Sequence, residues 1–229
     1  MNLHTPYPYW LLKNGFLCEY PSLRHPLQVD YLVMGGGITG ALTAWYLAQA
    51  GVGVAVVDRR HIGMGSTCAS TALLQYEIDV PMHKLAKFVG EKNAARSYRL
   101  CIDAIDKLEQ ICEKMPLPTG FERKPSVYCA SRKADLEDID LEYAIRQKHD
   151  IQVERWDKND VARAFPHFQS PGALYSPHDG AQVDAYSLTH ALLQDALRCG
   201  AQVFDKTEIT DIQHEKTQVV LRTNHGHSI

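Results

Sequence analysis

Two short apolar runs near the start of the chain, at 29–34 and 52–57, have the length and β-branched content of buried strands. Between them, apolar residues recur at helical spacing over 38–50, and Gly51 follows as a typical helix stop. Two parallel strands joined by one helix form a βαβ unit, so this pattern predicts such a unit.

Further along the chain, helical and extended patterns alternate. From Glu91 to Met115 apolar residues return every three or four positions, which predicts a long helix that ends before Pro116. Asp157 is a candidate N-cap for a short helix that closes at Phe165. We also expect helices over 133–148 and 186–199, extended segments over 126–130, 151–156, 172–176, 201–204, 207–214 and 218–222, and a Pro-His-Asp-Gly turn directly after residue 176.

The first 27 residues carry no such periodicity. They contain several prolines and aromatic residues, which is typical of an irregular arm that lies over the surface. The candidate anchors of this arm are Trp10, Leu11, Leu12 and Phe16.

Composition narrows the class of protein. The chain has 229 residues, of which 45% are hydrophobic, and a formal net charge of −3, so it can bury a core and offers no basic face for nucleic acid. Six cysteines without a C-x-x-C pair give no zinc-site spacing, and free thiols suit a reducing cytoplasm. Glycines interrupt the apolar stretch 31–57, so we interpret it as buried strand-helix-strand and expect no membrane span.

A glycine motif joins the first predicted strand to the helix. Gly35, Gly37 and Gly40 form G-x-G-x-x-G, and Asp58 closes the second strand about twenty residues later, as in dinucleotide-binding βαβ units. Glycines allow the tight turn and let a pyrophosphate approach the helix N-terminus, while the carboxylate can accept from ribose hydroxyls. A glycine-rich turn without a ligand is the alternative.

The glycines alone leave NAD and FAD open, and the next segment favours FAD. Residues 59–75 form a loop rich in glycine, serine and threonine, which can donate hydrogen bonds along a large ligand. A structure in which residues 35–40 were buried under side chains, with no cavity that reaches Ser66, would exclude this interpretation. Whether Tyr76, Glu77 or Asp79 touches a substrate or belongs to a polar cluster at a sheet edge stays open.

Asp-Arg-Arg-x-Ile-Gly-x-Gly-Ser-Thr at 58–67, together with the glycine motif, resembles the D-amino-acid oxidase-like (DAO) family of FAD-dependent oxidoreductases. A second block at 171–212 is similar to the stretch in which the chains of this family pass from the substrate domain back to the FAD-binding domain. The layout is closest to gamma-glutamylputrescine oxidase-like and glycine oxidase-like members. The resemblance implies an α/β fold: a Rossmann-like FAD-binding domain with an inserted α+β substrate region. The implied divisions are an N-terminal arm at 1–27, a first segment of the FAD-binding domain at 28–90, a helical and substrate-domain segment at 91–180, and a second, incomplete segment of the FAD-binding domain at 181–229.

The resemblance also implies site residues. The glycine turn faces the pyrophosphate, Asp58 and Arg59 meet the adenosine, Ser66 lies along the phosphates, and Ile209 contacts the adenine through its backbone. The complete set of implied FAD-binding residues is Gly35, Gly36, Gly37, Ile38, Thr39, Gly40, Asp58, Arg59, Arg60, Gly65, Ser66, Thr67, Thr71, Leu73, Gln75 and Ile209.

The implied activity is hydride transfer from a C–H of a small amine or amino acid to the flavin. No catalytic residue is identified, because Cys68 and Ala72 stand near the positions where sarcosine oxidases carry histidine and arginine. The family's later Ala-Thr-Gly strand has no counterpart, so we infer a truncated chain with little activity of its own. The alternatives are an NAD(P)-dependent dehydrogenase and an inactive nucleotide-binding fragment.

Overall fold

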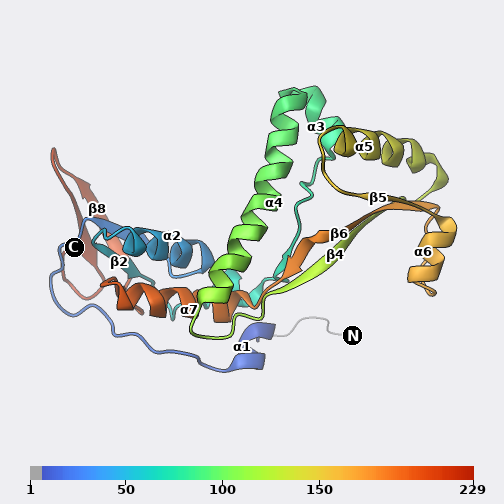
Figure 1. Cartoon of the computed structure of the whole chain (residues 1–229). Helices are drawn as coiled ribbons and strands as arrows, with labels where there is room; N and C mark the ends of the chain where they lie inside the picture. The colour runs from blue at the N-terminus through green and yellow to red at the C-terminus, as the bar shows by residue number, and fades with distance from the viewer. Residues whose placement is uncertain (1–6) are drawn as a thin grey trace. The chain divides into compact units, whose positions relative to one another are not determined.

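The two apolar runs form adjacent parallel strands in the computed structural model, which describes residues 7–229. Strand β1 (Tyr31–Met34) pairs with β2 (Val54–Val57), and helix α2 (Ile38–Gln49) connects them (Figure 1). Strand β7 (Gln202–Phe204) pairs with the other edge of β2, also in parallel. All four residues of β2 are buried because this strand is central in the sheet. The predicted βαβ unit is confirmed.

The chain divides into two structural units. Unit 1 comprises the residues up to Ala72, Lys114–Gly120 and Asp184–Ile229, and unit 2 comprises Leu73–Glu113 and Phe121–Val183. The first change of unit therefore falls after residue 72, earlier than the division at residue 90 given by the family resemblance. The last change falls after residue 183, three residues beyond the expected division at 180.

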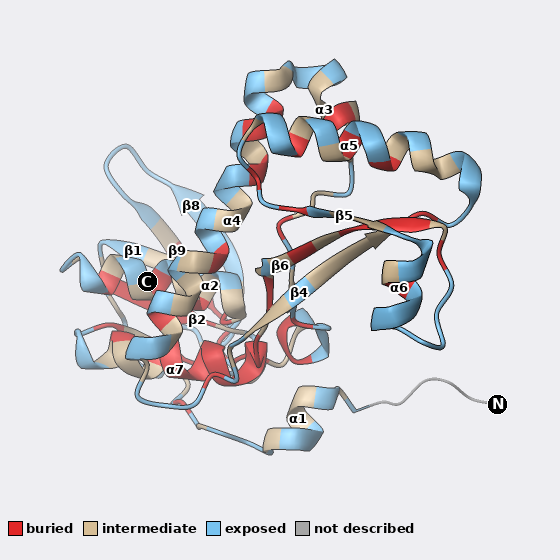
Figure 2. Cartoon of the chain, turned by 45° about the vertical axis from the view of Figure 1, so that its right-hand side comes forward, coloured by how far each residue is buried: buried red, intermediate tan, exposed pale blue. Residues whose placement is uncertain are grey.

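Helix α7 (Ala185–Arg198) is the most continuously buried helix of unit 1 (Figure 2). Asp184 caps its start by accepting from the Ser187 N–H at 3.0 Å. The helix packs against α2, which presents the small side chains of Ala41, Ala44 and Ala48. Small residues on this face allow close approach, so the helices cover the sheet without large gaps. Unit 1 also contains the 3-10 helix η1 (Ser66–Ala69) and the hairpin of β8 (Ile209–His214) and β9 (Val219–Thr223).

The N-terminal arm differs from the prediction in two ways. It contains a short helix, α1 (Tyr9–Asn14), and the expected anchors Leu12 and Phe16 are 63% and 62% exposed. The expected anchors Trp10 and Leu11 are half-buried, and Trp10 donates its Nε1–H to the Ser70 carbonyl at 2.8 Å. Tyr20 and Leu23, which were not expected as anchors, are buried. Leu23 also donates its N–H to Thr207 Oγ1 at 3.0 Å, so both backbone and side chain fix this point. Apolar content alone did not show which side chains face the core.

Unit 2 is built on a sheet in which every pairing is antiparallel. Its long strand β6 (Gly172–Gln182) pairs with β3 (Leu73–Leu74), β4 (Glu122–Cys129) and β5 (Glu154–Asp157). The helices are α3 (Met82–Val89), α4 (Glu91–Lys114), α5 (Leu136–Lys148), which follows the short 3-10 helix η2 (Lys133–Asp135), and α6 (Lys158–Ala164). Asp157 caps α6 as predicted, by accepting from the N–H groups of Asn159 and Asp160.

The expected turn after residue 176 is wrong, because β6 continues through it. The pairing with β4 shifts between Lys124 and Ser126, and the unpaired stretch holds Pro125 on one strand and Pro177 on the other. Proline has no N–H to donate, so a bulge is a place where a strand tolerates it. Beyond the bulge, Gly180 lies so close to the Lys124 carbonyl that a Cβ would be 2.7 Å from the oxygen. Pro177 and Gly180, which are typical turn residues, therefore allow a bulge and a close approach of two strands here.

Substituting Gly40 tests the tightness of the β1–α2 turn. A Cβ at this position would lie 1.9 Å from the backbone oxygen of Gly35, which cannot move without opening the turn. We expect Gly40→Ala to destabilise the chain by about 2 kcal/mol through overpacking, which is a fall in Tm of about 5 °C for a chain of this size. Thr43→Ala, on the exposed face of the same helix, is the control and should leave Tm nearly unchanged. Equal Tm values for the two variants in a thermal melt would contradict this geometry.

Candidate functional site

The turn between β1 and α2 leaves its first glycine open to the outside. Gly35 donates its N–H to the Val57 carbonyl at 2.8 Å, which joins the ends of the two strands. Its φ is +108°, a conformation that side chains rarely adopt, and a Cβ built there would meet nothing within 4 Å. The backbone at Gly35 is therefore open to a ligand, with no side chain covering it.

Asp58 fastens this turn to the end of β2. One carboxylate oxygen accepts from the Gly36 N–H and the other from the Arg60 N–H, each at 2.8 Å. Asp58 is only half-buried, and an ionised carboxylate offers about four acceptor sites. It can therefore hold the turn and still accept from a ligand hydroxyl.

The start of α2 is partly covered by the chain's own loop. Thr67 Oγ1 accepts from the Ile38 N–H at 3.0 Å, in place of the N-cap side chain that Gly37 lacks. Ile62 packs over Gly36, where a Cβ would lie 2.2 Å from Ile62 Cδ1. A side chain at position 36 would therefore have to displace Ile62.

A cavity of about 420 Å³ opens at the carboxyl ends of the parallel strands. The connection from β7 to β8 forms one wall, because Thr207 donates its N–H to the Asp58 carbonyl at 2.8 Å and Lys206 donates to the Arg60 carbonyl at 3.0 Å. The lining residues are Met34, Gly35, Val57, Asp58, Arg59, Arg60, Thr207, Glu208 and Ile209.

Five of the residues predicted from the family resemblance meet in this cavity. They come from three separate points of the sequence, namely Gly35, the run Asp58–Arg60, and Ile209. Gly65 lies beside them, since a Cβ on it would be 3.3 Å from Arg60 Nη2. Gly36, Gly37, Ile38 and Gly40 belong to the same turn but do not line the cavity, and Thr39 is exposed on the first turn of α2.

Other predicted residues do not line the cavity. Ser66 is exposed on η1 and is absent from the cavity wall, so the expected extension from the glycine turn to Ser66 is not seen in this cavity. Thr71 is exposed, and Leu73 and Gln75 are exposed residues of unit 2.

The wall residues that sequence reasoning missed are Met34, Val57, Thr207 and Glu208. The rule that ligands bind beyond the carboxyl ends of parallel strands could have indicated the first two.

Unit 2 contains a buried charged network. Glu142 is fully buried and accepts from Arg146 Nε at 2.8 Å, and its two oxygens also accept from the Met82 and His83 N–H groups at 2.9 Å each. A carboxylate from α5 thus caps the start of α3. Burial alone would raise the pKa of Glu142, but the Arg146 charge and these donors outweigh burial and lower it.

Tyr76 and Glu77 belong to the same network. Arg146 donates to the Tyr76 hydroxyl at 2.7 Å. Burial raises the pKa of Tyr76 to about 12, although the Arg146 charge acts in the opposite direction. Glu77 accepts from Ser126 at 2.6 Å through one oxygen. Its other oxygen is buried and has no hydrogen-bond partner among the described residues. Asp79, by contrast, is exposed.

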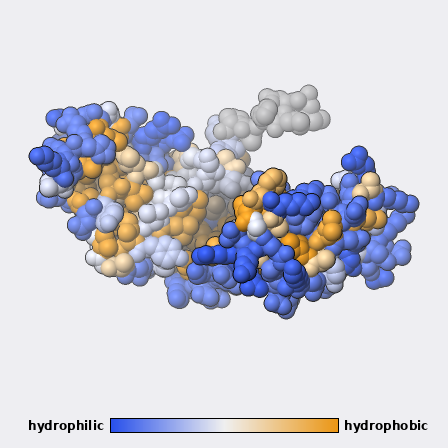
Figure 3. All heavy atoms as spheres, turned by 90° about the horizontal axis from the view of Figure 1, so that it is seen from above, coloured by the Kyte–Doolittle hydropathy of each residue, from blue (hydrophilic) through white to orange (hydrophobic). Residues whose placement is uncertain are grey.

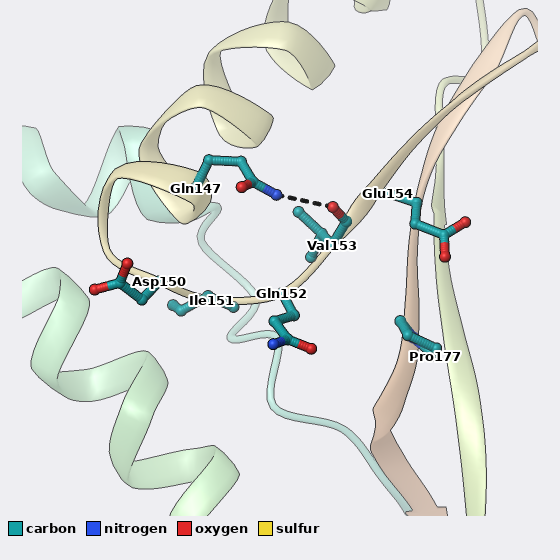
Figure 4. Close-up of a pocket in the computed structure, with 7 residues that line it drawn as sticks. All are labelled: Gln147, Asp150, Ile151, Gln152, Val153, Glu154 and Pro177. Carbon is teal, nitrogen blue, oxygen red and sulfur yellow. Dashed lines mark hydrogen bonds between the residues drawn. The ribbon is translucent and has the colours of Figure 1, made fainter.

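A second cavity, of about 370 Å³, lies in unit 2 beside β5 (Figure 4). Gln147 donates to the Val153 carbonyl at 2.9 Å, while Asp150 and Glu154 point away from each other. None of the predicted site residues lines this cavity, and its polar groups do not converge on one point. It therefore offers no arrangement for chemistry.

Across residues 7–229, no helix combines the length and the apolar character that crossing a bilayer requires.

A parallel βαβ unit with a bare glycine turn and a carboxylate at the end of its second strand defines a dinucleotide-binding protein. The chain belongs to the DAO family of FAD-dependent oxidoreductases, whose family model matches residues 30–229. The family resemblance and the α/β fold expected from it are thereby confirmed, and FAD is the cofactor of this family.

Curated relatives agree with this assignment. Glycine oxidase from Geobacillus kaustophilus is 26% identical over 87% of this chain and 52% of its own length. Gamma-glutamylputrescine oxidoreductase from Escherichia coli is 24% identical over 99% of the chain and 52% of its own length. A putative Rieske 2Fe-2S iron-sulfur protein from Bacillus subtilis is 24% identical over 97% of the chain and 42% of its own length. The chain spans about half the length of the curated relatives it matches.

Solved structures show the same fold. The crystal structure of glycine oxidase from Geobacillus kaustophilus superposes with a TM-score of 0.72 at 23% identity, over 88% of this chain and 52% of that one. L-amino acid deaminase from Proteus myxofaciens superposes with a TM-score of 0.76 at 15% identity, over 94% of this chain and 46% of that one.

The Glu142 network predicts a pH-dependent stability. Glu142→Gln should cost about 3 kcal/mol of unfolding free energy at neutral pH, because it removes the carboxylate nearest to the buried Arg146 guanidinium and leaves only Glu77, at 3.6 Å, to balance that charge. The pKa of Glu142 is lower in the folded chain, so its stabilisation is present above the unfolded pKa of about 4.3 and is lost as pH falls through the folded value. Urea unfolding from pH 7 to acid should show the gap between wild type and variant narrowing only below about pH 4.3.

Glu137→Gln is the matched control, since Glu137 lies on the same helix and is exposed. It should change the unfolding free energy by less than about 0.5 kcal/mol at each pH. A Glu142→Gln cost that stays constant into strong acid would show that the ionised carboxylate is not the source of the stabilisation.

Proposed function

We propose that this chain supplies the FAD-binding part of an oxidoreductase that acts on a small amine or amino acid. The cavity between Gly35, Asp58 and Ile209 is the site we assign to the adenosine end of the cofactor. When bound, FAD supplies the capacity to accept a hydride from a substrate C–H.

The observation that carries the proposal is the convergence of three distant segments on one cavity. Gly35 offers bare backbone, Asp58 offers free acceptor sites, and Ile209 offers an apolar wall. A ribose diol needs the acceptor and an adenine ring needs the apolar wall. The residues present therefore fit the adenosine half of FAD.

The start of α2 fits the diphosphate less completely. Its dipole and its first-turn N–H groups favour an anion, but the Ile38 N–H is held by Thr67 and the Gly36 N–H by Asp58. We assign to Arg59 and Arg60, which line the cavity, the task of balancing the diphosphate charge. Thr67 orients the loop that follows Asp58 by binding the helix start.

The substrate class rests on the relatives. Glycine oxidase and gamma-glutamylputrescine oxidoreductase both carry an amine-containing compound in their names. We extend that chemistry, oxidation beside nitrogen, to the protein that contains this chain. The alternative of a chain that binds nucleotide without catalysis stays a prediction of the sequence.

A binding measurement on the 229-residue chain tests the cofactor site. We expect FAD to bind, with quenching of its fluorescence, and ADP to compete for the same cavity because both share the adenosine diphosphate. Asp58→Asn should weaken FAD binding about tenfold, since it removes the charge that strengthens the bond to a ribose hydroxyl.

Asp30→Asn is the matched control. Asp30 also accepts from a glycine N–H, that of Gly53 at 3.0 Å, but it lies just before β1, away from the cavity. It should leave the Kd for FAD unchanged. Equal weakening by both substitutions, or tighter binding of NAD⁺ than of FAD, would refute the assignment of this cavity to FAD.

A further inference from the structure

Phe88 is 80% exposed, which is the highest value for a large hydrophobic side chain in residues 7–229. It stands at the end of α3, followed by Val89, which is 45% exposed, and by Gly90, where α3 gives way to α4. Asn93 Nδ2 donates to the Val89 carbonyl at 2.8 Å and fixes this corner to the first turn of α4. The Phe88 ring is therefore exposed on a helix corner that a side-chain hydrogen bond holds in place, and its surroundings decide what it can bind.

The same corner concentrates positive charge. Residues 84–100 contain five basic side chains and one acidic side chain, in a chain whose formal net charge is −3. The acidic member, Glu91, is engaged by Lys148 and His149, each at 2.7 Å. The basic members are Lys84, Lys87, Lys92, Arg96 and Arg99.

Three of these cations are free. Within residues 7–229, no acidic group forms an ion pair with Lys87, Lys92 or Arg96, and all three are exposed. Lys84 pairs with Asp138 at 2.6 Å, and Arg99 reaches Asp150 at 3.7 Å, where Asp150 is itself 93% exposed. The free cations lie on both sides of Phe88 in the sequence.

Lys92, Arg96 and Arg99 share one face of α4, since they are spaced four and three residues apart. They line a shallow cavity of about 380 Å³ together with Leu100, which is 54% exposed, and with one carboxylate, that of Asp103, against the three cations. Strongly hydrophilic and hydrophobic surfaces lie next to each other near the middle of Figure 3. Such a cavity has room for a phosphate group beside an apolar chain.

We propose that the α3–α4 corner docks on the surface of a bilayer that contains anionic phospholipid. Free cations attract the phosphate layer, each contributing about a fivefold gain in binding, and Phe88 with Val89 enters the boundary between headgroups and acyl chains. An acidic protein partner would match the charge, but it gives no reason for an isolated aromatic side chain at the apex of the corner. The chain lies on the membrane by this corner and does not cross it.

Vesicle sedimentation tests the docking surface. The 229-residue chain should sediment with phosphatidylcholine vesicles that contain about 30% phosphatidylglycerol, should not sediment with pure phosphatidylcholine, and should be released at about 0.5 M salt. Phe88→Ser should weaken binding about tenfold, and the double variant Lys92→Glu with Arg96→Glu should weaken it by at least that factor. Circular dichroism should show that each variant keeps its helix content.

Matched variants separate this corner from a general effect of charge or hydrophobicity. Lys107→Glu with Lys114→Glu makes the same charge change on exposed positions of the same helix, and Phe168→Ser removes an aromatic side chain that is 48% exposed elsewhere in unit 2. Both should bind vesicles like wild type. Equal losses in the control and test variants, or no sedimentation with anionic vesicles, would overturn the proposal. Retention on immobilised polyglutamate without vesicle binding would overturn it in favour of an acidic protein partner.

Discussion

The carboxylate of Asp58 is the interaction on which the cofactor-binding unit depends. It accepts one N–H from the turn after β1 and one from the segment after β2, so a single side chain fixes the ends of both strands. The backbone of the same residue bonds to β7 and to Thr207, which brings the third segment to the same point. A charged acceptor serves this role well, because bonds to an ionised group are about twice as strong as neutral ones.

Much of the fold could be predicted from local pattern. The βαβ unit, α4, α6 with its Asp157 cap, and α7 each carry a periodicity or a cap that the sequence displays without knowledge of neighbours. The continuity of β6 could not be predicted, because Pro177 and Gly180 have the chemistry of a turn and only the pairing with β4 makes a bulge there. The buried anchors Tyr20 and Leu23 also depend on distant partners, whereas the expected anchors Leu12 and Phe16 are exposed.

The candidate cavity was predictable where the motif itself forms it. Gly35, Asp58 and Ile209 line the same cavity, and their contacts with a cofactor stay a prediction. Thr207 and Glu208 were missed because their place depends on hydrogen bonds between the β7–β8 connection and the end of β2. The role of Ser66 stays a prediction, since the loop folds back so that Thr67, and not Ser66, meets the start of α2.

The place of β7 in the sheet has a consequence for biosynthesis. Residues 55–57 of β2 pair on one edge with β1, just before them, but on the other with residues 202–204. As the chain leaves the ribosome, all of unit 2 is made before that second edge can be covered. An apolar strand with an open edge invites pairing with other chains. The soluble yield of this chain should therefore rise with added chaperones and with lower growth temperature, although its composition is ordinary for a globular protein.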